Sequence, residues 1–127
     1  MTSNGTAAAA GRRIPSAAVP FYALNLFDLA DNEDYLAYSR RSSQAVAAHG
    51  GRVIALGKHA EHPGEVGPDE PREAMVLVEW RERAAFDSFL DDPEHGDLHP
   101  LRESGTRRYI WWTFDRIEDL RPLLKSR

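Results

Sequence analysis

Hydrophobic residues concentrate in four short segments that have the lengths of β-strands. These segments cover residues 21–28, 52–57, 73–80 and 109–114. Successive side chains of a strand point to opposite faces, and in the first and last segments both sets are largely apolar. A strand with one solvated face would carry polar residues at alternate positions. The pattern therefore predicts a sheet that is covered on both faces.

The last segment carries two adjacent tryptophans, Trp111 and Trp112, which fall on opposite faces of the predicted strand. Tyr109 shares the face of Trp111, whereas Ile110 and Phe114 share the face of Trp112. A chain of 127 residues has room for one layer of helices, so one face needs another cover. We therefore predict an obligate homodimer that encloses a space for a small molecule.

Two segments between the strands have the pattern of amphipathic helices. The first covers residues 31–49, with Asp31 or Asn32 as the capping residue, and Gly50-Gly51 ends it. The second covers residues 82–91 and ends before a proline. Its predicted apolar face is formed by Ala85, Phe86, Phe89 and Leu90. Short helical segments are expected over residues 98–103 and 118–124.

The element order is β-α-β-β-α-β, which predicts an α+β, ferredoxin-like fold. In that fold a four-stranded antiparallel sheet carries both helices on one face. Residues 21–124 form the single predicted domain, and residues 1–20, rich in alanine, glycine and serine, are a predicted disordered leader. Proline and glycine punctuate residues 58–72, which favours a loop or an irregular hairpin extension.

Composition excludes several classes of function. The net charge of -4, from 16 basic and 20 acidic residues, argues against nucleic-acid binding. The absence of cysteine excludes disulfides and thiolate metal sites. No stretch approaches the roughly 20 apolar residues of a membrane span, and no secretory signal follows Arg12-Arg13, so a cytoplasmic protein is expected. Phosphate-binding loops, serine elbows and dinucleotide fingerprints are missing from the sequence.

Three short motifs, in this order and spacing, resemble the dimeric α+β barrel superfamily, in which two ferredoxin-like domains pack sheet to sheet. They are Gly50-Gly51-Arg52, the Val-Leu-Val-Glu-Trp run at residues 76–80, and Asp92-Pro93-Glu94-His95 followed by Pro100-Leu101-Arg102. Over residues 21–115 the chain is most similar to a bacterial family of unknown function, which usually carries tyrosine at the position of His95. Relatives include antibiotic-biosynthesis monooxygenases, EthD-like proteins, haem-degrading enzymes, isomerases and cyclases. The resemblance thus implies a fold and no single reaction.

His95 and His99 are candidates for acid–base chemistry. Four residues apart on a helix, they would share one face, with Asp97 between them. Gly96 and Pro100 argue against a regular helix here, so a solvated loop is the alternative. Two histidines also suit a metal, but no third ligand is identified, and we predict neither metal nor cofactor. His59 and His62 are a predicted lid or simply exposed loop residues.

The first helix carries small polar residues on its inner side, at Ser39, Ser42 and Ser43. Small residues beneath a sheet leave room, although the stripe is equally consistent with the border of a weakly apolar face. In relatives the ligand lies between sheet and helices. The resemblance therefore implies a substrate pocket lined by Tyr35, Tyr38 and Ser42 and closed by Trp80 and by Trp111 or Trp112.

Three charged residues are further substrate-binding candidates. Glu79 and Arg52 lie on neighbouring predicted strands, and a structural ion pair between them is favoured over catalysis. Arg102 suits a carboxylate or phenolate substrate, but a surface ion pair with Glu103 or Asp97 is the favoured interpretation.

The sequence thus favours a cofactor-independent enzyme for a hydrophobic cyclic or polyketide-like metabolite. Cyclisation, isomerisation or oxygenation would use His99 or His95 as the acid–base group, with Tyr35 as the next candidate. Two alternatives stay open: a dimer that binds a small molecule without chemistry, and a haem-handling protein.

Overall fold

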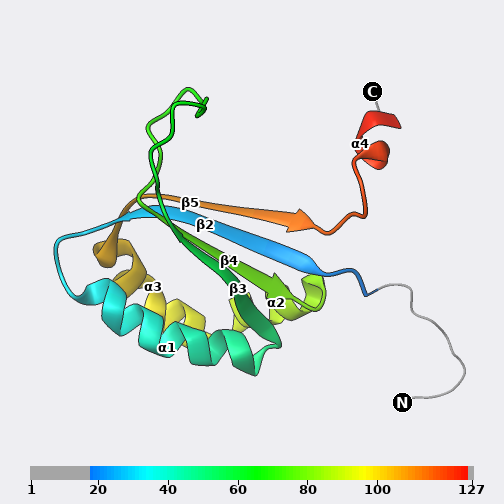
Figure 1. The fold of residues 1–127 in the computed structure, drawn as a ribbon. Helices are drawn as coiled ribbons and strands as arrows, with labels where there is room; N and C mark the ends of the chain where they lie inside the picture. Colours follow the sequence, from blue (N-terminus) through cyan, green and yellow to red (C-terminus); the bar gives the residue numbers. More distant parts are fainter. Residues whose placement is uncertain (1–17, 126–127) are drawn as a thin grey trace, which may run out of the picture.

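The computed structural model describes residues 18–125, which form one four-stranded antiparallel sheet and four helices (Figure 1). The strand order is β3-β4-β2-β5. The strands are β2 (Phe21–Leu29), β3 (Gly51–Lys58), β4 (Ala74–Trp80) and β5 (Thr106–Asp115). The helices are α1 (Asp34–Ala48), α2 (Arg83–Asp91), α3 (Pro93–Gly105) and α4 (Arg121–Lys125).

The ferredoxin-like prediction is confirmed. Helices α1, α2 and α3 lie on one face of the sheet, and α4 lies beyond the end of β5 (Figure 1). The segment between β3 and β4 projects as a twisted hairpin on the side of the sheet away from the helices. Residues 1–17 of the predicted leader lie outside the described residues. None of the helices within residues 18–125 is long and apolar enough to cross a membrane.

The two faces of the sheet differ in cover, as the alternation predicts. On β2 the inward residues Phe21, Ala23 and Phe27 are buried against the helices. The register pairs Leu24 with Trp112 on the open face, where the Trp112 side chain is 54% exposed. Strand β5 therefore sends alternate aromatic side chains into the helical layer and onto the open face.

The segment after α2 is a 13-residue helix, α3, which contains the short helical segment expected over residues 98–103 and extends it back to Pro93. The alternative of a solvated loop around His95 and His99 is therefore wrong. The Asp92 carboxylate accepts a hydrogen bond from the backbone N–H of Glu94 at 2.9 Å, and Pro93 occupies the first turn, where a missing N–H costs nothing. Pro100 removes one bond inside the helix, but it lies on the exposed side. The cap and the exposed position explain why proline does not end this helix.

The core lies where α2 meets the sheet. Trp80 is 1% exposed and packs against Phe86 and Phe89, with ring centroids 5.6 and 4.9 Å apart. Leu90, predicted on the same helix face, is instead exposed, because it lies one helical step beyond Phe89 at the border of the face. At the other end of the helical layer, a Cβ atom on Gly105 would lie 2.5 Å from the backbone nitrogen of Tyr35.

Candidate functional site

A cavity of about 150 Å³ lies between the sheet and the helical layer. Its walls come from all four strands and from α1 and α2. Most of its lining is apolar or aromatic, including Val46, Val76, Val78, Trp80, Phe89 and Trp111. A partly open, mostly apolar space with few polar groups is the usual form of a small-molecule site.

Helix α1 supplies the polar part of the cavity wall. Tyr35, Tyr38 and Ser42 line the cavity, and so do Ser39 and Ser43. The hydroxyl of Ser39 donates to the carbonyl of Leu36 at 3.0 Å, so the hydroxyl hydrogen of this serine is used within α1. The stripe of small polar residues therefore borders a real space, and any contact with a substrate remains a prediction.

Asn25 is a buried polar residue on the inward face of β2 and also lines the cavity. Its amide nitrogen donates to the carbonyl of Val76 at 3.0 Å, and its side-chain oxygen accepts a hydrogen bond from the hydroxyl of Tyr109. Neither residue was predicted from the sequence to belong to a site. A lone asparagine among Phe21, Ala23 and Phe27 on an inward strand face was the available signal.

Three tyrosines, Tyr35, Tyr38 and Tyr109, meet at one end of the cavity. Burial raises the pKa of Tyr35 to about 12 and raises the pKa of the other two. The guanidinium of Arg102 opposes this effect without cancelling it. At neutral pH all three hydroxyls therefore remain protonated and act as hydrogen-bond donors.

Arg102 from α3 lies at the same end, over two rings of β5. Its guanidinium carbon is 4.9 Å from the ring centroids of both Tyr109 and Trp111. The predicted ion pair with Glu103 or Asp97 does not form; within residues 18–125, no carboxylate pairs with Arg102. Rotating the arginine inward over the aromatic rings replaces a surface ion pair with cation–π contacts.

His95 and His99 lie on α3 but have different surroundings. His95 is half-buried and packs on Phe89 and Trp111, with ring centroids 4.8 and 6.0 Å apart. Burial, with help from the charge of Arg102, lowers the pKa of His95. His99 instead lies between the Glu103 carboxylate, at 3.2 Å, and the guanidinium of Arg102, at 3.0 Å.

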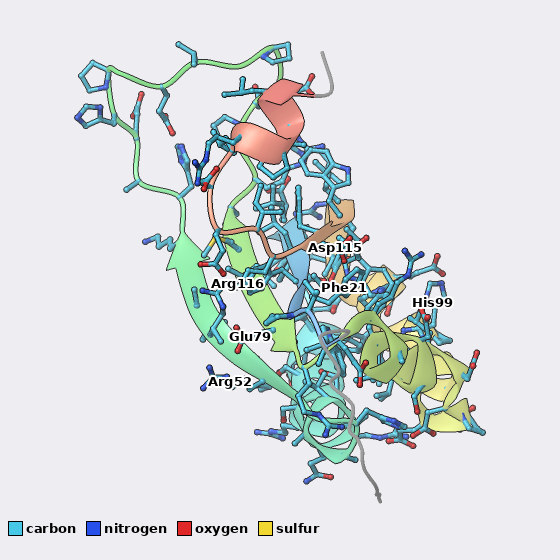
Figure 2. The ribbon with its side chains drawn as sticks, turned by 90° about the vertical axis from the view of Figure 1, so that its right-hand side faces the viewer. Phe21, Arg52, Glu79, His99, Asp115 and Arg116 are labelled. Carbon is cyan, nitrogen blue, oxygen red and sulfur yellow. The ribbon has the colours of Figure 1, made fainter. Side chains whose placement is uncertain are left out.

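Other residues singled out in the sequence lie away from the cavity. Arg52 and Glu79 form the expected ion pair, with 2.8 Å between nitrogen and oxygen, and both lie far from His99 (Figure 2). Trp112 belongs to the open face. In the hairpin, His59 pairs with Glu65 at 2.8 Å, and His62 is exposed. The structure thus brings together His95, Tyr35, Tyr38, Ser42, Trp80, Arg102 and Trp111, with His99 behind Arg102.

The site shows no arrangement for a metal within the described residues, but it has one buried donor without a partner there. Within residues 18–125, no cluster of three or more histidine, aspartate or glutamate side chains is arranged to bind a metal. The indole N–H of Trp80 is buried and lacks an acceptor among the described residues. An unsatisfied buried donor costs free energy, so a polar atom of a bound molecule that reached this N–H would be stabilised.

Chemically, the arrangement combines an apolar cavity, a histidine that favours its neutral form, protonated phenols and a cation. A neutral imidazole accepts a proton, and the cation and phenols stabilise negative charge on an oxygen.

Comparisons with known proteins place the fold. The family model "Domain of unknown function (DUF1330)" matches residues 20–113. No curated protein sequence matches the chain. A protein of unknown function from Rhodopseudomonas palustris is similar in structure at 23% identity, with a TM-score of 0.67 over 80% of this chain and 85% of that one.

Two more distant structures share the fold. SnoaB, a cofactor-independent oxygenase from Streptomyces nogalater, has 14% identity and a TM-score of 0.57, over 80% of this chain and 96% of its own. A dimeric ferredoxin-like protein of unknown function from Thermobifida fusca has 13% identity and a TM-score of 0.55, over 84% of this chain and 100% of its own.

Proposed function

The chain belongs to this family of unknown function, and we propose that it is a cofactor-independent enzyme that moves a proton on a hydrophobic cyclic metabolite. The observation that carries the proposal is that His95 and Arg102 both pack on Trp111, which lines an apolar cavity. Isomerisation and cyclisation both begin with such a proton transfer. An oxygenation that uses molecular oxygen begins with the same carbanion, and SnoaB shows that the fold supports cofactor-free oxygenation.

His95 is the proposed general base. Its lowered pKa keeps the imidazole neutral at physiological pH, so it can accept a proton from an acidic C–H group. The imidazole packs directly on Phe89 and Trp111, which both line the cavity, and we propose that it reaches a substrate bound there. The proton moves from carbon to the imidazole, and the electron pair moves to the neighbouring carbonyl oxygen.

Arg102 is the proposed partner for that oxygen. An enolate oxygen beside the guanidinium and the protonated tyrosines would gain charge-assisted hydrogen bonds. His99 then acts as a positioning residue, because its ring nitrogen contacts the guanidinium at 3.0 Å while its other nitrogen faces Glu103. The order of preference therefore changes from the sequence analysis: His95 comes first, and His99 supports Arg102.

The test measures the first half-reaction directly. Phenylacetone and phenylpyruvate carry an acidic C–H group beside a carbonyl, and proton NMR in D₂O follows deuterium incorporation there. We expect the protein to accelerate exchange in at least one of them. The variant His95→Gln should lose roughly 100-fold or more of that acceleration, whereas His62→Gln, changed at an exposed histidine of the hairpin, should keep it.

Two results would count against the enzyme. Full activity of His95→Gln would remove histidine catalysis. A bound molecule recovered unchanged, with no exchange in either ketone, would favour the alternative of a small-molecule-binding dimer. Haem handling fits poorly, because a cavity of about 150 Å³ has the size of the engineered cavity that holds one benzene.

A second copy of the chain is the proposed cover of the open face. This face carries the exposed Trp112 and Phe114 beside the half-buried Leu24 and Leu26. The Thermobifida fusca protein of the same fold is dimeric, which supports this assembly. We expect the dimer to work in the cytoplasm.

A further inference from the structure

The polar end of the cavity has positive charge nearby and no negative charge among its described lining residues. The guanidinium of Arg102 lies beside this end, over the rings of Tyr109 and Trp111, which line the cavity. The protonated hydroxyls of Tyr35 and Tyr38 add hydrogen-bond donors. No aspartate or glutamate lines the cavity, so the described wall supplies no negative charge.

Arg102 is also held in place for a ligand. The rings of Tyr109 and Trp111 contact its guanidinium, and the guanidinium donates one N–H to Nδ1 of His99 at 3.0 Å. Cation–π contacts offset part of the cost of partial burial and leave the charge of the guanidinium in place, so a carboxylate that reached it would gain charge-assisted hydrogen bonds. Arg102 is half-buried and no carboxylate pairs with it within residues 18–125, so it can bind the carboxylate of a ligand.

The cavity also sets a limit on size. Its volume of about 150 Å³ equals that of an apolar cavity known to hold benzene. The aromatic walls, among them Trp80, Phe86 and Phe89, form a rigid and tightly packed cluster. One six-membered ring fills a space of this volume, whereas a fused polycyclic skeleton would extend out of its open side.

We infer that the ligand is a single apolar ring bearing a carboxylate, with the ring in the cavity and the carboxylate on Arg102. This inference rests on the proposed function, because it identifies the substrate class of the same cavity. It narrows the sequence-based expectation, which included polyketide-like substrates, to monocyclic acids.

The experiment compares matched probes by isothermal titration calorimetry. Benzoate carries the ring and the charge, benzamide has nearly the same shape without the charge, and naphthalene-2-carboxylate adds a second ring. We expect benzoate to bind at least tenfold more tightly than either of the others. A charge-assisted hydrogen-bond pair accounts for a tenfold to hundredfold preference.

Variants assign that preference to Arg102. Arg102→Met keeps an apolar chain over the two rings and should remove the difference between benzoate and benzamide. Arg40→Met, changed at an exposed arginine of α1 outside the cavity, should keep it. If Arg102→Met fails to fold by circular dichroism, Arg102→Lys serves instead: it keeps the charge without the planar fork and should reduce the preference.

Several outcomes overturn the inference. They are equal binding of benzoate and benzamide, tighter binding of naphthalene-2-carboxylate, or no binding of benzoate. If deuterium exchange is catalysed equally fast in phenylacetone and phenylpyruvate, and benzoate does not inhibit it, the proposed enzyme activity stands and the inferred carboxylate-bearing ligand is wrong. If benzoate binds selectively but no deuterium exchange is catalysed, the inferred ligand class stands and the proposed proton-transfer activity is wrong.

Discussion

At the scale of single residues, neighbours decide which histidine is chemically suited to catalysis. The sequence shows that His95 and His99 are four residues apart, but not that one packs on Phe89 and Trp111 while the other faces Glu103. Arg102 was assigned to a surface ion pair for the same reason. Side-chain direction around a helix depends on packing partners from distant strands, which local spacing does not reveal.

The lowered pKa of His95 gives the first prediction. If neutral His95 is the base, the rate of catalysed deuterium exchange should decrease as the pH is lowered. The midpoint of this decrease should lie below the ordinary histidine pKa of about 6.5. Removing the charge in Arg102→Met should move the His95 pKa upward, because that charge disfavours the imidazolium. NMR titration of the imidazole protons measures this shift independently of activity. An unchanged His95 pKa in the variant would contradict the electrostatic assignment.

The lowered pKa of His95 also makes the free energy of unfolding depend on pH. The folded state takes up the His95 proton less readily than the unfolded chain, which titrates near 6.5. The contribution of His95 is therefore fully present above that pH. It decreases as the pH falls from about 6.5 toward the lowered folded pKa.

At the scale of elements, strand alternation and glycine punctuation predicted the order of the four strands and of the first two long helices. Boundaries moved by a few residues, and β5 begins at Thr106 because its ladder with β2 continues through a bulge between Leu26 and Asp28. Helix α3 was predicted only over residues 98–103, because Gly96 and Pro100 have low helix propensity. The Asp92 cap and packing against α1 outweigh that propensity.

The two glycines of α3 provide the second prediction. Gly105→Ala should strongly lower the melting temperature, because its Cβ would meet the backbone of Tyr35 at 2.5 Å and neither backbone can move cheaply. Gly96→Ala is the matched control: nothing lies within 4 Å, so alanine should raise stability by about 1 kcal/mol through helix propensity. Thermal unfolding measured by circular dichroism compares them, and equal effects of the two changes would show that close packing at Gly105 is not needed.

At the scale of the whole molecule, the sheet separates two surfaces with different tasks. The helical face encloses the cavity, and the open face presents large apolar side chains. The adjacent tryptophans of β5 predicted this division correctly, since a side-chain period of two leaves no other arrangement. The cavity was less predictable, because its size depends on how α1 and α2 pack over the sheet.

The open face gives the third prediction. Trp112→Lys should convert a dimer to a monomer in size-exclusion chromatography with light scattering, because a buried charge without a partner opposes association. Leu56→Lys is the control: Leu56 is 73% exposed on edge strand β3 and faces the helical side by its register with Val76. It should leave assembly unchanged. A monomeric unmodified protein would reject the proposed cover.

Because Trp111 lines the cavity and Trp112 lies on the open face, one dipeptide carries two optical reporters for separate events. The emission of Trp111 should respond to ligand, since its indole contacts His95 and Arg102, and the emission of Trp112 should respond to subunit exchange. A third tryptophan, Trp80, also lines the cavity, so the signals are separated in a Trp80→Phe background. Replacing Trp111 or Trp112 by phenylalanine there leaves the signal of the other. Strand β5 thereby offers a built-in way to ask whether occupancy of the cavity alters assembly.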